Sequence, residues 1–163
     1  MFKKRVMTDG IREKIRQYKK SKIDIADLLK GVLITGEDLS FSYISELNVV
    51  GEDISNCNFS NTTIKLIANK TKMKNVKFIR TQFLPGSSLR GADCRGSNFF
   101  KANFAHIDYS YSDLRGCNVC GAIFSFSSNL GYQCKISENA IDLFKKWWKI
   151  VPGEPMVDMK VED

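Results

Sequence analysis

The stretch SSLRGADCRGSNFFKANFAHIDYSYSDLRGCNVCGAIF, residues 87–124, repeats a pattern every five residues. Most units read small, then polar, then large and apolar, as in Ala102-Asn103-Phe104. A period of five fits neither an α-helix, with 3.6 residues per turn, nor a plain strand, whose side chains alternate with period 2. It fits a chain that turns a corner every five residues.

The same period extends toward the N-terminus, with large central residues that are all apolar, Tyr or Cys. Four corners close a square, so about 20 residues make one coil, and stacked coils hydrogen-bond like parallel strands ~4.8 Å apart. The central residue then fills the interior, the small residue packs beside it, and the others face water. The central positions are Leu39, Ile44, Val49, Ile54, Phe59, Ile64, Met73, Phe78, Phe83, Leu89, Cys94, Phe99, Phe104, Tyr109, Leu114, Val119 and Phe124.

These triplets resemble the A-[D/N]-[L/F]-x-x motif of the pentapeptide-repeat family from about Gly31 to Leu130. The resemblance implies an all-β solenoid, a right-handed quadrilateral β-helix of about five coils. A solenoid must cap its open ends. We therefore expect a basic N-terminal helical cap over residues 1–30, the β-helix over 31–136, and a C-terminal helix with a tail over 137–163.

Several positions depart from the repeat. Glu37 and Glu52 fall where a small inward residue is expected, and a buried carboxylate is costly unless it is paired. The register slips over residues 65–72, which predicts a bulge or loop. It slips again at Pro85-Gly86, which predicts a one-residue insertion at a corner, because both residues favour turns.

Each end of the chain has a pattern typical of a helix. Residues 10–20 form a basic amphipathic pattern with Ile11, Ile15 and Tyr18 on one face. At the other end, Ser137 is a suitable N-cap and Pro152-Gly153 stops the pattern. The second helix is predicted to cap the last coil, or to cap it and also form a dimer contact, because adjacent Trp residues point in different directions. The residues concerned are Leu143, Phe144, Trp147 and Trp148.

Composition favours a single domain in a reducing compartment. The chain has 163 residues, a formal net charge of +7 and 43% hydrophobic residues, enough to bury a core. No apolar run approaches the ~20 residues that span a bilayer, and the N-terminus lacks the apolar segment of a signal peptide. The five Cys are therefore expected to be reduced thiols, and the location cytoplasmic.

No residue pattern points to catalysis. His106 is the single His and falls at an outward repeat position. Cys117 and Cys120 have CxxC spacing, but the repeat explains both, and the second CxxC of a four-Cys zinc site does not follow. Phosphate-binding glycine loops and a nucleophile elbow are also absent. We expect a protein that is not an enzyme and uses neither cofactor nor metal.

Three surface features could bind a partner. One is a basic run that is explained most simply as a solvated face or loop, with contact to an acidic protein or nucleic acid as the alternative. Another is a stripe of alternating charges that recurs from one coil to the next, which is either a plain ion-pair ladder or a recognition surface. The third is a set of outward aromatic residues, including Tyr111. The predicted partner-binding residues are Lys65, Lys70, Lys72, Lys74, Lys77, Arg80, Asp93, Arg95, Phe100, Asp113, Arg115 and Phe126.

The pattern as a whole favours a non-enzymatic interaction or scaffold protein with a protein partner. The family resemblance implies an alternative, the quinolone-resistance Qnr group, whose members bind type II topoisomerases by mimicking duplex DNA. That role needs an acidic surface, and this chain is basic outside its first coils. A further alternative is direct nucleic-acid binding, weakened because outward aromatics for base stacking are few in the basic run.

Overall fold

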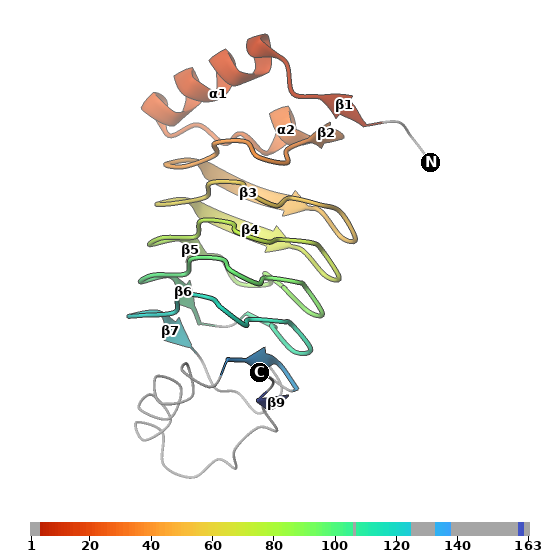
Figure 1. Cartoon of the computed structure of the whole chain (residues 1–163). Coiled ribbons are helices and arrows are strands. Elements are labelled where there is room, and N and C mark those ends of the chain that lie inside the picture. The colour runs from red at the N-terminus through yellow and green to blue at the C-terminus, as the bar shows by residue number, and fades with distance from the viewer. Residues whose placement is uncertain (1–3, 106, 125–132, 138–159, 162–163) are drawn as a thin grey trace.

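Stacked coils of chain make up the molecule, with a helix lying across the N-terminal end (Figure 1). The computed structural model describes residues 4–105, 107–124, 133–137 and 160–161. Its elements are β1 (Arg5–Val6), α1 (Asp9–Ser21), α2 (Ala26–Leu29), β2 (Val32–Leu33), β3 (Tyr43–Asn48), β4 (Thr63–Ile67), β5 (Gln82–Phe83), β6 (Asn103–Phe104), β7 (Ile123–Phe124), β8 (Lys135–Ile136) and β9 (Lys160–Val161).

Four parallel ladders hold successive coils together. The chain passes from one ladder to the next at Tyr43, Asn48, Asp53, Asn58 and Thr63, so the coil has four sides. The first ladder contains strands β3 to β7 and the other three consist mainly of isolated bridges. The rungs are Asp24, Tyr43, Thr63, Gln82, Asn103 and Ile123 (first); Asn48, Ile67, Ser88 and Asp108 (second); Asp53, Lys72, Asp93, Asp113 and Lys135 (third); Asp38, Asn58, Lys77, Asn98 and Asn118 (fourth).

The central residues of the repeat point inward, which confirms the main prediction from the sequence. Phe99, Phe104, Leu114 and Val119 are at most 4% exposed, and the other central residues from Leu39 to Tyr109 are buried as well. The side chain of Phe124 lies outside the described part of the chain. Rings stack along the axis, with centroids 5.4 Å apart for Phe59–Phe78 and 5.0 Å for Phe78–Phe99. Each such side chain contributes about 1.5–3 kcal/mol by burial.

Helix α1 begins and ends with ordinary capping interactions. The Thr8 hydroxyl accepts a hydrogen bond from the Ile11 amide at 3.3 Å, and Lys22 ends the helix in the left-handed conformation. Ile15 is 3% exposed, while Ile11 and Tyr18 pack against the core, as the amphipathic pattern predicted. The apolar face of α1 therefore covers the N-terminal end of the coil stack.

Two coils differ in length, and the differences cancel. The step between the first two ladders is five residues from Tyr43 to Asn48, four from Thr63 to Ile67, and six from Gln82 to Ser88. The segment predicted as a bulge or loop, residues 65–72, begins in strand β4, which is one residue short and whose pairing with β3 shifts register between Ile44 and Leu47, an irregularity of the predicted kind. The six-residue step contains the one-residue insertion predicted at Pro85-Gly86. Gly86 there has a φ of 82°, a conformation that glycine adopts at little cost.

The two Glu residues expected to face inward are only partly buried, and each pairs with a basic residue of the segment that precedes the coils. Arg12 donates two hydrogen bonds to Glu37, Nη2 to Oε1 at 2.6 Å and Nε to Oε2 at 3.0 Å. Lys4 forms an ion pair with Glu52. The sequence pattern did not show these partners, because they lie far away in the chain. Paired in this way, the two carboxylates avoid the cost of an isolated buried charge.

Part of the C-terminal prediction lies outside the described residues, namely the helix with Leu143, Phe144, Trp147 and Trp148, and the positions His106 and Phe126. Ser137, predicted to begin that helix, accepts a hydrogen bond from the Gly116 amide at 2.7 Å. None of the described helices has the length and apolarity needed to cross a membrane.

Candidate functional site

The predicted stripe of alternating charges lies on the third ladder. Asp93 and Asp113 are adjacent rungs, and each is held by the Arg two positions later. Arg95 contacts both carboxylate oxygens of Asp93 at 2.8 Å, and Arg115 contacts those of Asp113 at 2.9 and 2.7 Å. Such two-point pairs fix the orientation of both side chains. The four residues therefore form one ordered strip.

Lys72 and Lys74 extend this strip toward the N-terminus. Lys72 lies 2.8 Å from Asp53, and Lys74 lies 3.6 Å from Asp93. Arg95 also reaches Asp113, at 3.6 Å, so the pairs are continuous across rungs. We call this set the ion-pair wall: Asp53, Lys72, Lys74, Asp93, Arg95, Asp113 and Arg115.

Two carboxyl groups of the ion-pair wall have strongly lowered pKa values. The hydrogen bond from Lys72 lowers the pKa of Asp53 to about 2, and the hydrogen bond from Arg95 lowers the pKa of Asp93 to about 2. Both groups are therefore ionised at neutral pH, and their charge is matched within the wall. The wall offers a partner few unpaired charges.

The predicted basic run does not form one surface. Its residues follow the chain around a coil, so they occupy different sides. Lys65, on β4, pairs with Glu46 at 2.7 Å. Lys77 is a rung of the fourth ladder, Lys70 lies at the corner after the second, and Arg80 lies at the corner before the first. Three of the six, Lys65, Lys72 and Lys74, already have acidic partners.

One corner combines exposed aromatic and basic side chains. It lies between the fourth and first ladders. At its N-terminal end it includes Lys22, the residue that ends α1. The other four residues lie in successive coils, and each donates its backbone amide to a carbonyl of the next coil. All five have φ between 53° and 56°. We call this corner the Phe41 edge: Lys22, Phe41, Asn61, Arg80 and Lys101.

Phe41 is the most exposed aromatic side chain among the described residues, at 66%. With Tyr43, 40% exposed, it lines a hollow of about 480 Å³ that also includes Lys22, Asn61 and Thr63. Phe41 was not among the binding residues predicted from the sequence. The signal was present, because Phe41 follows central Leu39 by two positions, where the repeat faces outward.

The predicted aromatic residues do not gather on one side. Phe100 is half-buried next to the Phe41 edge, with the Lys101 ammonium 5.1 Å from its ring centroid. Tyr111 is 44% exposed at the corner between the second and third ladders, with the Arg90 guanidinium 4.6 Å from its ring centroid. These cation–π contacts orient both rings. Of the two that the structure describes, Phe100 lies beside the Phe41 edge and Tyr111 lies at another corner.

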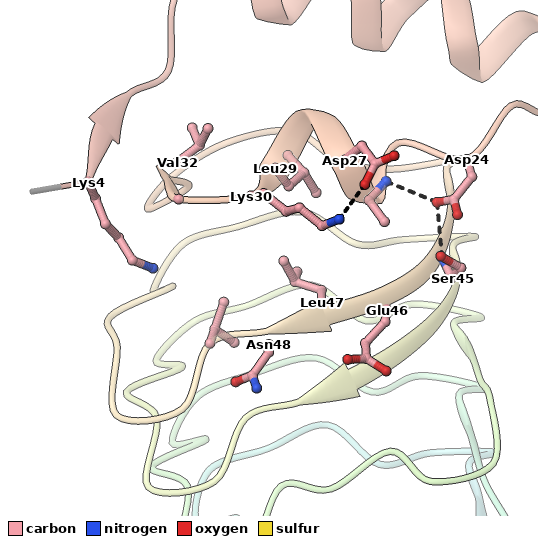
Figure 2. Close-up of a pocket in the computed structure, with 13 residues that line it drawn as sticks. Lys4, Asp24, Asp27, Leu29, Lys30, Val32, Ser45, Glu46, Leu47 and Asn48 are labelled. Atoms are coloured by element: carbon pink, nitrogen blue, oxygen red, sulfur yellow. Dashed lines mark hydrogen bonds and ion pairs between the residues drawn. The ribbon is translucent and has the colours of Figure 1, made fainter. Parts of the chain in front are cut away.

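A polar cleft of about 400 Å³ separates α2 from β3 at the N-terminal end (Figure 2). Its charged groups are largely satisfied from within. Asp24 accepts hydrogen bonds from the amides of Ala26, at 2.9 Å, and Ser45, at 3.0 Å, and Asp27 pairs with Lys30 at 2.6 Å. The contacts of these residues therefore hold α2 against β3. They account for the charged groups of the cleft without a ligand.

The thiols have environments that fit packing. Cys117 donates from Sγ to the Cys94 carbonyl at 3.0 Å, and burial raises the pKa of the Cys117 thiol to about 12, which leaves it unreactive. Cys120 is exposed at the outward position of its unit. Across the residues that the structure describes, no three His, Cys, Asp or Glu side chains gather as a metal site.

These features define a class of protein, a four-sided parallel β-helix whose walls rather than an interior cavity carry the polar groups. The family model described as Pentapeptide repeats (8 copies) matches residues 84–108. This match lies within the repeat that the sequence analysis identified, agrees with the resemblance to the pentapeptide-repeat family, and implies a right-handed β-helix.

Solved structures of pentapeptide-repeat proteins resemble this chain. Rfr23 from the cyanobacterium Cyanothece 51142 is 18% identical with a TM-score of 0.42, and the match covers 58% of this chain and 61% of Rfr23. A protein from the Arabidopsis thaliana thylakoid lumen is 18% identical with a TM-score of 0.40, over 69% of this chain and 74% of that one.

QnrB1, a plasmid-mediated fluoroquinolone resistance protein, is 18% identical with a TM-score of 0.25, over 64% of this chain and 74% of QnrB1. The chain spans less than two thirds of the Rfr23 structure. No curated protein matches the sequence.

Proposed function

We propose that this protein is a non-enzymatic binding module that presents a rigid β-helical wall to a protein partner. The observation that carries the proposal is the division of the repeat into buried central residues and outward residues fixed on ladders. With the interior filled by side chains such as Phe78 and Phe99, recognition is left to the outer walls. Side chains held at regular ~4.8 Å steps suit recognition of a macromolecular surface.

The same proposal gives the helices a structural role. Helices α1 and α2 cap the N-terminal end and protect the first coil from pairing with another chain. The first ladder steps five times from Asp24 to Ile123, which supports about five coils. A cap and a dimer contact at Trp147 and Trp148 remain predictions. Light scattering at high protein concentration tests the dimer, and a monomer there removes it.

Mimicry of DNA by an acidic wall is a weaker alternative. The first coils carry five acidic residues that could form such a wall, but each has a basic partner. The pairs are Glu37–Arg12, Asp38–Lys19, Glu46–Lys65, Glu52–Lys4 and Asp53–Lys72. A surface neutralised in this way attracts a basic groove weakly. A DNA supercoiling assay with and without the protein decides between the two, since a mimic inhibits or protects the topoisomerase.

The proposal is tested by affinity capture with the immobilised full chain. A lysate is passed over it with and without an excess of the free protein, and bound proteins are identified by mass spectrometry. We expect at least one protein that the free chain displaces with saturation. If no displaceable protein is captured and the purified chain turns over a small molecule, the proposal is wrong.

A further inference from the structure

We propose that the Phe41 edge is the docking surface, and that its occupant is an acidic protein segment carrying one large apolar side chain. This inference rests on the proposed function and names the partner's chemistry. Two independent observations point to the same edge: the exposed hollow beside Phe41, and the cations along it that form no ion pair within the described part of the chain.

The backbone of the Phe41 edge is strained for the residues that occupy it. A left-handed conformation costs a side chain with Cβ on the order of 1–2 kcal/mol, and a bulky residue there is unusual. The described corner between the third and fourth ladders has the same conformation with Gly36, Asn56, Asn75, Gly96 and Gly116, whereas the corner between the second and third ladders has it with Lys70 and Tyr111. The left-handed conformation is therefore shared by two corners with large side chains, and what distinguishes the Phe41 edge is the hollow and the charges described next.

The exposed hollow is shaped for an apolar side chain. Phe41 and Tyr43 stand one coil above Asn61 and Thr63, and the four enclose the hollow together with Lys22 and Ser42. Phe41 keeps 66% of its surface in contact with water. Covering its ring therefore removes a large apolar area from water. An aromatic anchor in a small pocket is the usual centre of a protein interface.

The cations of the edge lack the partners found on the ion-pair wall. Lys22, Arg80 and Lys101, with Lys77 beside them, form no ion pair with any carboxylate in the described part of the chain. Lys22 and Lys101 are four rungs apart, about 19 Å at ~4.8 Å per rung. Unpaired positive charge on both sides of an apolar hollow complements carboxylates on both sides of an apolar side chain.

A nucleic acid fits this edge less well. Duplex DNA carries one negative charge for about every 1.7 Å of its axis, whereas four cations over ~19 Å are sparse. Single strands stack successive bases on aromatic rings. Phe41 and the coil of Phe100 are three rungs apart, about 14 Å, which is too far for successive bases.

The test measures fluorescence anisotropy with two labelled probes, a ten-residue peptide of Glu with one central Leu and a ten-residue oligothymidine. We expect the peptide to bind the full chain, more weakly at high salt. Phe41→Asn should weaken binding about tenfold or more, the loss typical of an interface anchor, without lowering Tm, because Asn tolerates the left-handed conformation. Lys101→Glu should weaken it about fivefold or more.

Matched controls come from the corner between the second and third ladders. Tyr111, an exposed aromatic residue, and Lys70 have φ of 60° and 55°. Tyr111→Asn and Lys70→Glu should leave peptide binding within about twofold, as expected away from an interface. Equal losses for edge and control variants, no peptide binding, or tighter binding of oligothymidine at the edge would each overturn the inference.

The same variants used as bait separate this inference from the proposed function. If wild-type chain captures a displaceable protein and Phe41→Asn captures it equally, the docking edge is wrong while the binding function stands. If wild type captures no displaceable protein and turns over a small molecule, the proposed function itself is wrong.

Discussion

The ion-pair wall and the Phe41 edge are built by the same repeat but treat charge in opposite ways. On the wall, Arg95 and Arg115 are each held by a carboxylate two positions earlier, so the side chains satisfy one another. On the edge, Lys22, Arg80 and Lys101 have no such carboxylate among the described residues, and an aromatic side chain stands between them. We expect the wall to stabilise the coil stack, and we propose the edge as the surface that binds a partner.

The largest expected effect on stability comes from comparing a residue inside the coil with a residue on the Phe41 edge. Phe78 lies between Phe59 and Phe99 with no exposed surface, so Phe78→Ala should lower the free energy of unfolding by about 3–5 kcal/mol. Phe41→Ala, the same substitution on the edge, should change it by less than about 0.5 kcal/mol. Urea denaturation followed by circular dichroism measures both. Equal losses would place Phe41 in the core.

A smaller effect compares two corners of the same coil stack. Gly96 has a φ of 71°, and a Cβ there would lie 2.6 Å from Asn75 Oδ1. Gly96→Ala should therefore cost about 1–3 kcal/mol. Phe41 has a φ of 56°, so Phe41→Gly relieves strain and should not destabilise. Thermal unfolding of the two variants measures both effects. It shows whether glycine is required at position 96 and tolerated at position 41. A destabilised Phe41→Gly would show that the ring supports the fold.

Removing one charge from the wall should have a modest effect. Asp113→Asn leaves Arg115 without its two-point partner and removes the contact with Arg95, at a cost of about 1 kcal/mol. Asp9→Asn is the control, since Asp9 pairs with Arg12 but its side chain is 99% exposed. Chemical denaturation should detect the first loss and little change in the second. A neutral Asp113→Asn would mean that the wall adds no stability.

The smallest effect is on acid stability. The folded pKa values of Asp53 and Asp93, about 2, lie below the ordinary value of 3.8. Between pH ~4 and ~2 the unfolded chain therefore binds more protons, so the stabilisation present above pH ~4 is lost as pH falls through this window. Partial exposure limits it to about 1 kcal/mol or less. Tm measured from pH ~5 to ~2 should fall less steeply for Asp93→Asn than for wild type.

The buried residues could be predicted because the five-residue period determines which side chains point inward. The five-residue spacing places Phe99 and Phe104 inside, and the spacing of one full coil places Asp93 and Asp113 on one wall. Binding by that wall remains a prediction. Contacts between distant segments could not be predicted, such as Arg12 with Glu37, because no periodicity relates a helix before the coils to a position within them.

The Phe41 edge was missed for a different physical reason. Its distinguishing feature is the hollow that Phe41 lines with residues of neighbouring coils, whereas in the sequence Phe41 is one more outward residue. The sequence also did not show that the basic residues lie on different sides of the coil. Because the chain turns every five residues, neighbours in the sequence are distributed around the coil. Lys72 and Lys77 are close in sequence but belong to different ladders.

The unequal coils have a consequence for how such a chain can change length. The step shortened at Thr63–Ile67 is restored by the longer step from Gln82 to Ser88, so later rungs return to the phase of the first. A residue lost at one corner is thus tolerated where a neighbouring turn supplies an extra one. In such a chain we therefore expect an insertion or deletion in one coil to be accompanied by the opposite change in a neighbouring coil.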